Sequence, residues 1–326
     1  RFPGALIWTP GLGGPDNAAV LVWFGVDLFD LSRSRQCMAA NLLLTESGPR
    51  NLVDDTDDSA DMSCQIVQWN NALKEIKSHL ASGTLRTLVE RQSLNSPKLV
   101  EHLRHHDKLS RSNSNLGISH VDSDTILHCN SPISLENPII TKWVDYVTNN
   151  YVAPTGIDNV LILLPCSARK PYRMSKSHRK FMNAIGISSY HEVMITSPLG
   201  LVPRDLEEVW PAGHYDIPVT GDWAQDESNR VTEMLDAIIA KNDYRIVINH
   251  SGFDYNCDIP VIDTRQGDSA TNHASLKRLS DAVLDNLRVK RRSGELMNLE
   301  SFRSVARFHY NNDAVSAQVT HPNKIC

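Results

Sequence analysis

The stretch VLILLPCSARKPYRMSKSH, residues 160 to 178, decides the fold of the chain. Its first five residues, Val160 to Leu164, form an apolar run that is too short for a helix and is typical of a strand buried on both faces. Polar residues follow at once and predict a loop. Cys166 and Ser167 stand where the strand ends, so the sequence places a thiol and a hydroxyl at the rim of a sheet.

The loop after this strand is strongly basic. Six Lys or Arg residues and His178 lie between Arg169 and Lys180, and no acidic residue interrupts them. A nucleophile beside a basic loop suits an anionic or nucleotide substrate. The alternative is an ordinary strand-to-helix turn that contains a packed cysteine and a solvated run of charge.

Strand and helix patterns alternate through this part of the chain. Short apolar runs predict further strands at residues 193–195 and 246–248, and helical spacing of apolar residues follows each strand. Ser175 or Ser177 is expected to cap the first of these helices, which stops at Gly186. The repetition predicts an α/β fold with a parallel sheet and helices on both faces.

The predicted sheet indicates where a ligand would bind. In open α/β sheets the ligand site lies beyond the carboxyl ends of the strands. Parallel strands would bring three polar strand ends to one rim. These ends are Cys166–Ser167, Thr196–Ser197 and Asn249–His250–Ser251.

Length and composition limit the class of protein. The 326 residues allow two domains or slightly more, and the net charge of −5 indicates that any nucleic-acid contact is a local patch. No apolar run reaches about 18 residues, so no membrane segment is expected. The chain starts at Arg1 without a signal-peptide pattern, and we expect both ends to be cut from a longer protein.

The six cysteines are scattered without a CxxC pair. This pattern argues against a disulfide framework and a zinc knuckle, and it favours a reducing cytoplasm. Neither a cofactor nor a metal is evident from the sequence.

Composition also suggests domain boundaries. We expect a first domain over residues 1–106 and a polar, Ser- and Asn-rich linker over 107–132. The α/β domain is expected over residues 133–290, and residues 291–326 are expected to begin a further module that the chain does not complete.

The segment LLPCSARKPYRMSKSH, residues 163–178, resembles the central signature of the archaeosine synthase family, archaeal tRNA-modifying proteins related to tRNA-guanine transglycosylase. Three other segments are similar to the same family: SLENPIITKWVDYV (134–147), ITSPLGLVPRDLE (195–207) and YDIPVTGDW (215–223). GVDLFD (25–30) and LLLTESG (42–48) resemble the end of its transglycosylase-like barrel.

The resemblance implies a fold for each domain. The first domain is expected to be the C-terminal part of a degenerate transglycosylase-like (β/α) barrel. The second is expected to resemble the parallel α/β sandwich of uracil-DNA glycosylases. A PUA domain normally closes such proteins, and the sequence shows no pattern for one.

The resemblance also implies a reaction. Members of the family act on tRNA that carries the nitrile base preQ0 (7-cyano-7-deazaguanine) at position 15, and they add the side-chain amine of free lysine to the nitrile. A separate radical-SAM partner protein then cleaves the adduct. The expected activity is that of a transferase acting on tRNA.

Three residues are expected to carry the chemistry. A thiolate of Cys166 would add to the nitrile and give a thioimidate, which the amine then displaces. Arg169, Lys170 and a nearby helix N-terminus are expected to lower the pKa of the thiol. His178 would transfer protons, with Ser167 beside the nucleophile. The alternatives are that Cys166 packs behind the strand and that His178 contacts phosphate.

Other residues are expected to bind the substrates. Asp205 or Glu207 would pair with the amine of lysine and Arg204 with its carboxylate, from a loop that begins at Ser197. Aromatic and amide side chains at the rim would contact the deazaguanine, unless they form a packed turn. These rim candidates are Tyr215, Asp216, Trp223, Asn249 and His250. The cations expected on tRNA phosphates are Arg169, Lys170, Arg173, Lys176 and Arg179.

Asp30 matches the nucleophile of true transglycosylases. The Pro-Thr-Arg that follows in that family is replaced by Leu31-Ser32-Arg33, and its zinc cluster of three cysteines and a histidine is missing because Cys64 stands alone. We therefore expect a degenerate scaffold that helps to hold tRNA. Residual base exchange through Asp30 and a non-catalytic tRNA-binding subunit are the competing hypotheses.

Overall fold

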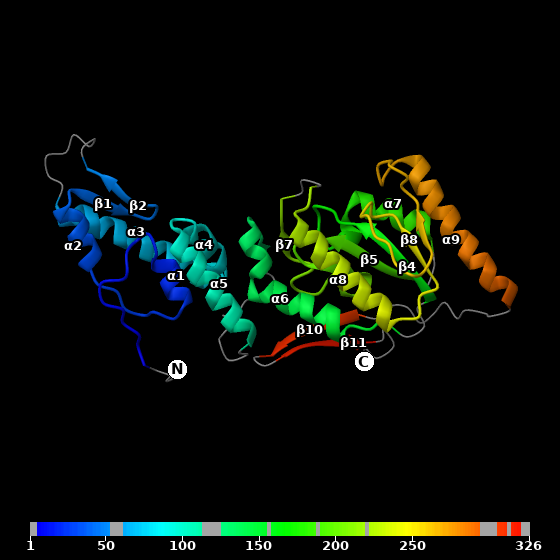
Figure 1. Cartoon of the computed structure of the whole chain (residues 1–326), viewed down its shortest axis with the longest axis horizontal. Helices are drawn as coiled ribbons and strands as arrows, with labels where there is room; N and C mark the ends of the chain where they lie inside the picture. Colours follow the sequence, from blue (N-terminus) through cyan, green and yellow to red (C-terminus); the bar gives the residue numbers. More distant parts are fainter. Residues whose placement is uncertain are drawn as a thin grey trace. The chain divides into compact units, whose positions relative to one another are not determined.

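The computed structural model divides the chain into two units that meet between Thr125 and Ile126 (Figure 1). It describes residues 5–52, 61–112, 125–154, 158–186, 190–218 and 222–293, and two strands at 305–311 and 314–320. The boundary between the units falls inside the linker expected at residues 107–132. Residues 113–124 of that linker lie outside the described residues.

The first unit is mainly helical. Its elements are α1 (Ala18–Trp23), α2 (Ser32–Ala39), β1 (Leu42–Thr45), β2 (Gly48–Asn51), α3 (Met62–Ala81), α4 (Leu85–Ser93) and α5 (Pro97–Ser112). Strands β1 and β2 form an antiparallel hairpin, and Trp8 and Leu28 make a single parallel bridge. Leu28 belongs to the GVDLFD segment, and the assignment of this unit to a barrel stays a prediction.

Helix α5 extends into the stretch expected to be a linker. Its buried residues include Leu103 and Asp107, and the Asp107 carboxylate accepts two hydrogen bonds from Arg86, at 2.6 and 2.7 Å. The side chain that faces the core at this point, Asp107, is therefore charged. The last turns of the helix consequently lack the regular spacing of apolar residues that marks a helix in the sequence. This is why the sequence pattern placed the boundary too early, at residue 106.

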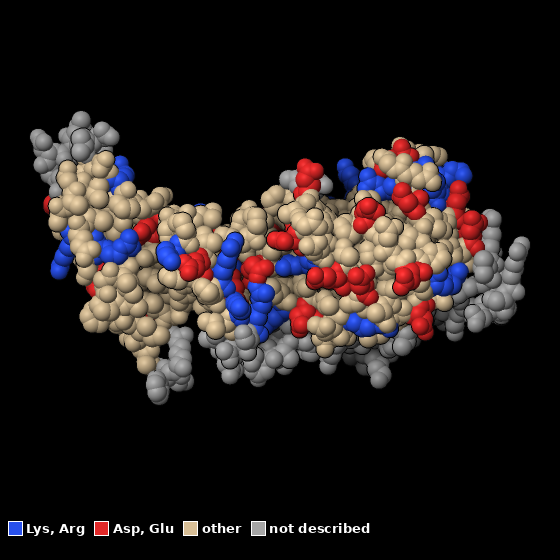
Figure 2. Space-filling model, in the orientation of Figure 1, with Lys and Arg blue, Asp and Glu red and all other residues tan. Residues whose placement is uncertain are grey.

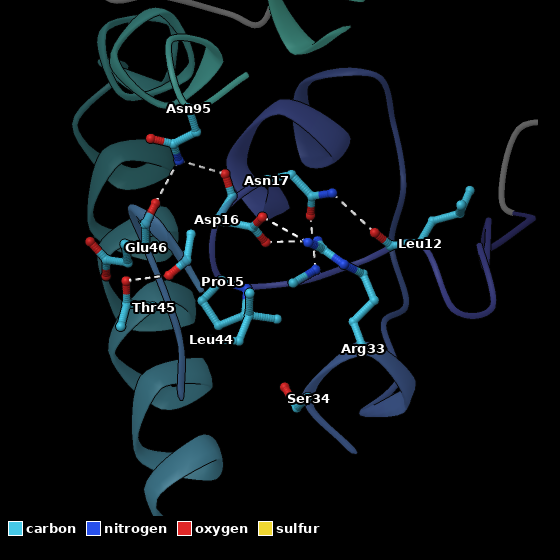
Figure 3. A network of polar contacts seen from close by, with 12 residues as sticks. Leu12, Pro15, Asp16, Asn17, Arg33, Ser34, Leu44, Thr45, Glu46 and Asn95 are labelled. Carbon is cyan, nitrogen blue, oxygen red and sulfur yellow. Dashed lines mark hydrogen bonds and ion pairs between the residues drawn. The ribbon is translucent and has the colours of Figure 1, made fainter. Parts of the chain in front are cut away.

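Polar contacts of side chains, with one another and with the backbone, hold the loop before α1 in place (Figure 3). Arg33 on α2 donates to both carboxylate oxygens of Asp16, at 2.7 and 2.8 Å. The Asn95 amide donates to the carbonyls of Asp16 and Glu46, at 2.8 and 2.6 Å. These side chains tie the loop to α2, to the β1–β2 turn and to the end of α4.

The second unit is built on a five-stranded sheet with the order β6-β5-β4-β8-β9 (Figure 1). Its strands are β4 (Asp158–Pro165), β5 (Tyr190–Thr196), β6 (Gly200–Pro203), β8 (Ile246–Asn249) and β9 (Val261–Asp263). All neighbours are parallel except β5 and β6, which are antiparallel. The three predicted strands are confirmed. The short edge strands β6 and β9 were missed.

Strand β4 lies in the middle of the sheet. All five side chains from Val160 to Leu164 are fully buried. Because successive side chains of a strand point to opposite faces, both faces of the sheet are covered at β4. Leu163 pairs with Val193 on β5 and with Asn249 on β8, which fixes the register of the three strand ends.

Helices and short turns of helix complete the second unit. They are η1 (Pro132–Glu136), α6 (Pro138–Asp145), η2 (Tyr146–Asn150), η3 (Tyr172–Met174), α7 (Lys176–Ile185), η4 (Arg204–Leu206), α8 (Gln225–Lys241) and α9 (His273–Ser293). A small parallel pair joins β3 (Leu127–His128) to β7 (Tyr215–Asp216), and β10 (Val305–Asn311) pairs antiparallel with β11 (Ala314–Thr320).

The start and end of α7 follow the sequence prediction. The Ser175 hydroxyl accepts a hydrogen bond from the His178 amide at 3.1 Å and caps the helix. The helix ends before Gly186, whose φ of 68° suits glycine. The cap fixes the basic loop between β4 and α7 at its far end.

We expect Leu163→Ala to lower the free energy of unfolding by about 2–5 kcal/mol, because the side chain is fully buried and its removal leaves a cavity. Urea denaturation followed by circular dichroism measures the change. Val152→Ala is the matched control, since Val152 is 60% exposed and its truncation should have little effect. Equal losses for the two variants would contradict the central placement of β4.

Candidate active site at the carboxyl edge of the sheet

The three polar strand ends lie on one edge of the sheet, as the sequence predicted. Cys166 follows β4, Ser197 follows β5, and Asn249 ends β8. Strand β4 pairs in parallel with β5 on one side and β8 on the other, so Cys166 stands between the other two ends. This edge is where parallel α/β sheets bind ligands.

Cys166 is half-buried beside Thr196 and Lys170. Burial raises the pKa of the Cys166 thiol, while the Lys170 charge and a hydrogen bond with Thr196 act to lower it. Burial outweighs these two effects. The expectation of a lowered thiol pKa is therefore wrong, because the loop that brings the lysine also shields the sulfur from water.

Lys170 lies inside the site rather than on the outer surface. Its ammonium sits 4.1 Å from the centroid of the Tyr215 ring, and burial lowers its pKa against the opposing effects of Cys166, Asp216 and Cys129. The expected contact of Lys170 with tRNA phosphate does not match this position. Its place beside the thiol fits a role in the chemistry.

Tyr215 forms the floor under this lysine. Its hydroxyl contacts the Tyr172 hydroxyl and lies 2.5 Å from Oγ1 of Thr196. Both tyrosines are buried, so the packed-turn alternative holds for Tyr215 and a base cannot stack on it. Asp216, the next residue, is exposed at the rim.

His178 is fully buried behind the loop and not at its surface. Its Nε2–H donates to the carbonyl of Pro165 at 3.0 Å, and its Nδ1 accepts from Arg204 at 3.2 Å. Burial and the Arg204 charge lower its pKa to about 3, so the ring is neutral. Both nitrogens are occupied, which argues against proton transfer and indicates that His178 holds the end of β4.

The residues expected to bind lysine lie elsewhere. Arg204 pairs with Glu192 at 2.7 Å and with Glu207 at 2.8 Å, so these charges neutralise one another. The Tyr151 hydroxyl donates to Asp205 at 2.8 Å, and burial raises the pKa of Asp205 to about 6. The reason for the error is β6, an antiparallel strand that returns the chain toward the amino end of β5.

The remaining rim candidates mostly shape their own loops. Asn249 donates to the carbonyl of Phe253 at 2.8 Å and accepts from the Ser251 hydroxyl at 2.7 Å. The two ring nitrogens of His250 contact Thr264 and the carbonyl of Ala270, at 2.7 and 2.8 Å. These contacts shape the loops that follow β8, and Asn249 also lines a hollow at the ends of β8 and β9.

Ser167 is a further catalytic candidate beside the thiol. Its hydroxyl donates to the carbonyl of Arg169 at 2.9 Å. This bond holds the basic loop in place, and a catalytic role for Ser167 stays a prediction.

A hollow of about 290 Å³ opens beside Ser197, at the end of β5. Its wall includes Pro132, Leu135, Pro198, Ile217, Pro218 and Trp223, together with Cys129, Asp222 and Glu227. Cys166 does not line the hollow. Thr196, which contacts Cys166, directly precedes Ser197 of the wall, and Cys129 of the wall lies near Lys170.

Sequence reasoning missed Glu227. It lies in the first turn of α8, where its carboxylate accepts from the Ser197 hydroxyl and, at 2.7 Å, from the Ala224 amide. An acid in the first turn of a predicted helix was the available signal, but such residues usually serve only as helix caps.

Most of the basic run lies on the surface. Arg169, Lys176 and Arg179 are exposed, and no ion pair to them is found within the described part of the chain. Arg173 pairs with Glu208. On the face shown in Figure 2, acidic and basic side chains are interspersed over the second unit, so a cationic patch would be local, as the net charge predicts.

Asp30 anchors a loop in the first unit. Its two carboxylate oxygens accept from the Gly11 amide at 2.9 Å and the Ser32 amide at 2.8 Å. The Ser32 hydrogen bond contributes most to lowering the pKa of Asp30. Both oxygens are therefore engaged at the start of α2.

The described residues lack two further kinds of feature. They contain no group of three or more His, Cys, Asp or Glu side chains placed to hold a metal ion. They also contain no helix that is both long and apolar enough to cross a bilayer. Their cysteines are all free thiols.

Fold and site together define an α/β domain with a half-buried thiol and a hollow at the carboxyl edge of its sheet. Residues 140–284 match a family described as a domain of unknown function, DUF5591. A crystal structure of a protein of unknown function covers 44% of this chain and 49% of its own, at a TM-score of 0.35 and 25% identity.

Curated relatives identify the family. The archaeosine synthase of Haloferax volcanii is 34% identical over 259 residues, covering 74% of this chain and 43% of that protein. The archaeosine synthase subunits alpha of Thermoplasma acidophilum and Methanosarcina acetivorans are 34% and 30% identical, covering 74% and 86% of this chain. The chain belongs to the archaeosine synthase family, and it spans about half the length of these relatives.

We expect alkylation of Cys166 by iodoacetamide to rise over a higher pH range than that of an exposed cysteine, because only the thiolate reacts and burial raises the pKa of the thiol. Lys170→Met should slow the reaction at neutral pH, since loss of the positive charge raises the pKa further. Peptide mass spectrometry at several pH values measures both effects.

Lys180→Met is the control for that experiment, since Lys180 is exposed and does not contribute to the pKa of Cys166. A rate that levels off well below pH 8, or equal rates in the Lys170 and Lys180 variants, would contradict the described surroundings of the thiol.

Proposed function

We propose that this chain is the part of an archaeosine-forming enzyme that adds the side-chain amine of free lysine to the nitrile of preQ0 at position 15 of tRNA. The observation that carries the proposal is the family relationship over most of the chain, combined with a thiol and a base-sized hollow at the same edge of the sheet. The activity is that of a tRNA-modifying transferase.

In this proposal the deazaguanine base enters the hollow beside Ser197. Trp223 and the prolines of its wall supply flat apolar surfaces, which suit a base taken out of its stack. Glu227 and Asp222 supply carboxylates, the acceptors that the N–H groups of a guanine edge require. The nitrile then points toward Cys166.

The chemistry has two balanced steps. The Cys166 sulfur forms a bond to the nitrile carbon, the C≡N bond becomes C=N, and the nitrogen takes a proton. The lysine amine then adds to the same carbon, and the C–S bond breaks to release the thiolate. The sum is addition of an N–H bond across the nitrile, so neither oxidant nor reductant is required.

We assign the proton transfer to Lys170. Burial raises the pKa of Cys166 and lowers that of Lys170, so the two values approach each other. The Lys170 ammonium can give a proton to the nitrile nitrogen as sulfur attacks and take the thiol proton in its place. His178, held by Pro165 and Arg204, positions the loop that carries both groups.

The exposed cations beside the site would hold the tRNA backbone. Arg169, Lys176 and Arg179 extend from the loop and the first turns of α7, next to the thiol in sequence. Phosphate contacts there would fix the orientation of tRNA without reading its sequence. A radical-SAM partner protein would then cleave the lysine adduct to leave the amidine.

The proposal extends to the evolutionary origin of the two units. The bridge between Trp8 and Leu28 is compatible with a remnant of a transglycosylase barrel in the first unit. The parallel order β5-β4-β8-β9 is compatible with a uracil-DNA glycosylase-like sheet in the second.

We expect the complete protein to convert preQ0-bearing tRNA and lysine into a nucleoside whose mass equals the sum of preQ0 nucleoside and lysine. Mass spectrometry of nucleoside digests detects it. Cys166→Ala should reduce the rate by at least about a hundredfold, because nucleophilic and proton-transfer contributions are typically that large.

Asp30→Asn is the companion variant, since it removes a loop anchor far in sequence from the thiol. It should keep adduct formation and show no guanine exchange. Exchange that depends on Asp30 would favour a transglycosylase. Full activity of Cys166→Ala would exclude the thioimidate, and tRNA binding without adduct would indicate a binding subunit.

We expect Lys176→Ala and Arg179→Ala each to weaken tRNA binding and to reduce the slope of log K against log salt by about one, as the loss of one phosphate contact does. Filter binding at several salt concentrations measures the slope. Lys277→Ala is the control, because its ammonium pairs with Asp281 at 2.9 Å on α9. Unchanged slopes would place the tRNA elsewhere.

A further inference from the structure

A second hollow lies at the carboxyl ends of β8 and β9, and the steps above do not use it. Its volume is about 370 Å³. The wall carries Asp254, Asp263 and Arg265 beside the aromatic rings of Phe253 and Tyr255. We propose that this hollow binds the α-ammonium and α-carboxylate of the free amino acid, a step that rests on the proposed function.

The acidic side of the hollow suits an ammonium group. Asp254 is exposed, and within the described residues its carboxylate makes no hydrogen bond or ion pair. Asp263 is fixed in place, because its two oxygens accept from the Arg265 amide at 2.8 Å and the Gln266 amide at 3.1 Å. Phosphate groups would be repelled here, which distinguishes this hollow from a site for tRNA backbone.

The guanidinium of Arg265 is held ready for a carboxylate. Its Nη1 donates to the carbonyl of Ser251 at 2.9 Å, and its Nε donates to the carbonyl of Asp268 at 2.8 Å. Gly252 makes this position possible, because a Cβ there would lie 2.0 Å from Nη1. These contacts orient the guanidinium, and Nη2 finds no acceptor among the described residues.

The two hollows lie on either side of the thiol. The first is at the end of β5, the second is at the ends of β8 and β9, and Cys166 follows β4 between them. Strands β5 and β8 are two strand spacings apart, roughly 10 Å. Trp223 of the first hollow and Phe253 of the second are in contact, with ring centroids 5.7 Å apart.

This arrangement suits a long amino acid as the amine donor. With its head group between Asp254 and Arg265, lysine would extend its four-carbon stem past the Trp223–Phe253 pair toward the thiol. The stem is apolar and matches the aromatic surface, while the terminal amine reaches the carbon bound to sulfur.

Equilibrium dialysis of labelled lysine against the complete protein tests the proposal. Two competitors each test one end of the head group. Aminocaproate lacks the α-amine, and cadaverine lacks the carboxylate. We expect Asp254→Asn to weaken lysine binding about tenfold, because one charge-assisted hydrogen bond is lost. The variant should then bind lysine and aminocaproate with similar affinity. Arg265→Gln should likewise make the affinities for lysine and cadaverine similar.

Asp258→Asn is the matched control, because it removes an equal charge from an exposed position on the same loop outside the hollow. Its lysine affinity should equal that of the unaltered protein. No lysine binding by the unaltered protein, or equal affinity in the Asp254 and Asp258 variants, would overturn the proposal. Specific lysine binding without adduct formation would instead refute the proposed reaction and leave this site standing.

Discussion

The burial of β4 on both faces is the constraint on which the rest of the second unit depends. A strand with every side chain from Val160 to Leu164 enclosed must have neighbours on both edges and cover on both faces. Parallel pairing with β5 and β8 then brings three strand ends to one edge. The chain leaves the core abruptly at Cys166, which places the sulfur at the boundary between core and solvent.

That boundary position governs the electrostatics of the site. Partial burial raises the pKa of the Cys166 thiol and lowers that of the Lys170 amine. A single physical cause therefore brings the two values together, because removal of water disfavours an anion and a cation alike. The Tyr215 ring beneath the lysine adds a surface that stabilises the positive charge of the ammonium.

Buried polar networks support the edge from behind. Arg204 links Glu192, Glu207 and His178, and His178 in turn holds the carbonyl of Pro165 at the end of β4. Buried charges are stable only when they are paired, so this network is self-contained and leaves no group free for a ligand. The two substrates are therefore assigned, in our proposals, to the hollows at the ends of β5 and of β8 and β9.

The sequence by itself determined the strand at residues 160–164, its two parallel neighbours, the Ser175 cap and the family, because these depend on local pattern and on a long motif. Only the tertiary structure decided which polar residues serve a site. From the sequence, His178, Arg204 and Glu207 were expected to act on substrates. In the fold they are buried and form hydrogen bonds and ion pairs with one another or with the backbone. Pattern cannot reveal this, since pairing and water exclusion arise from segments distant in the chain.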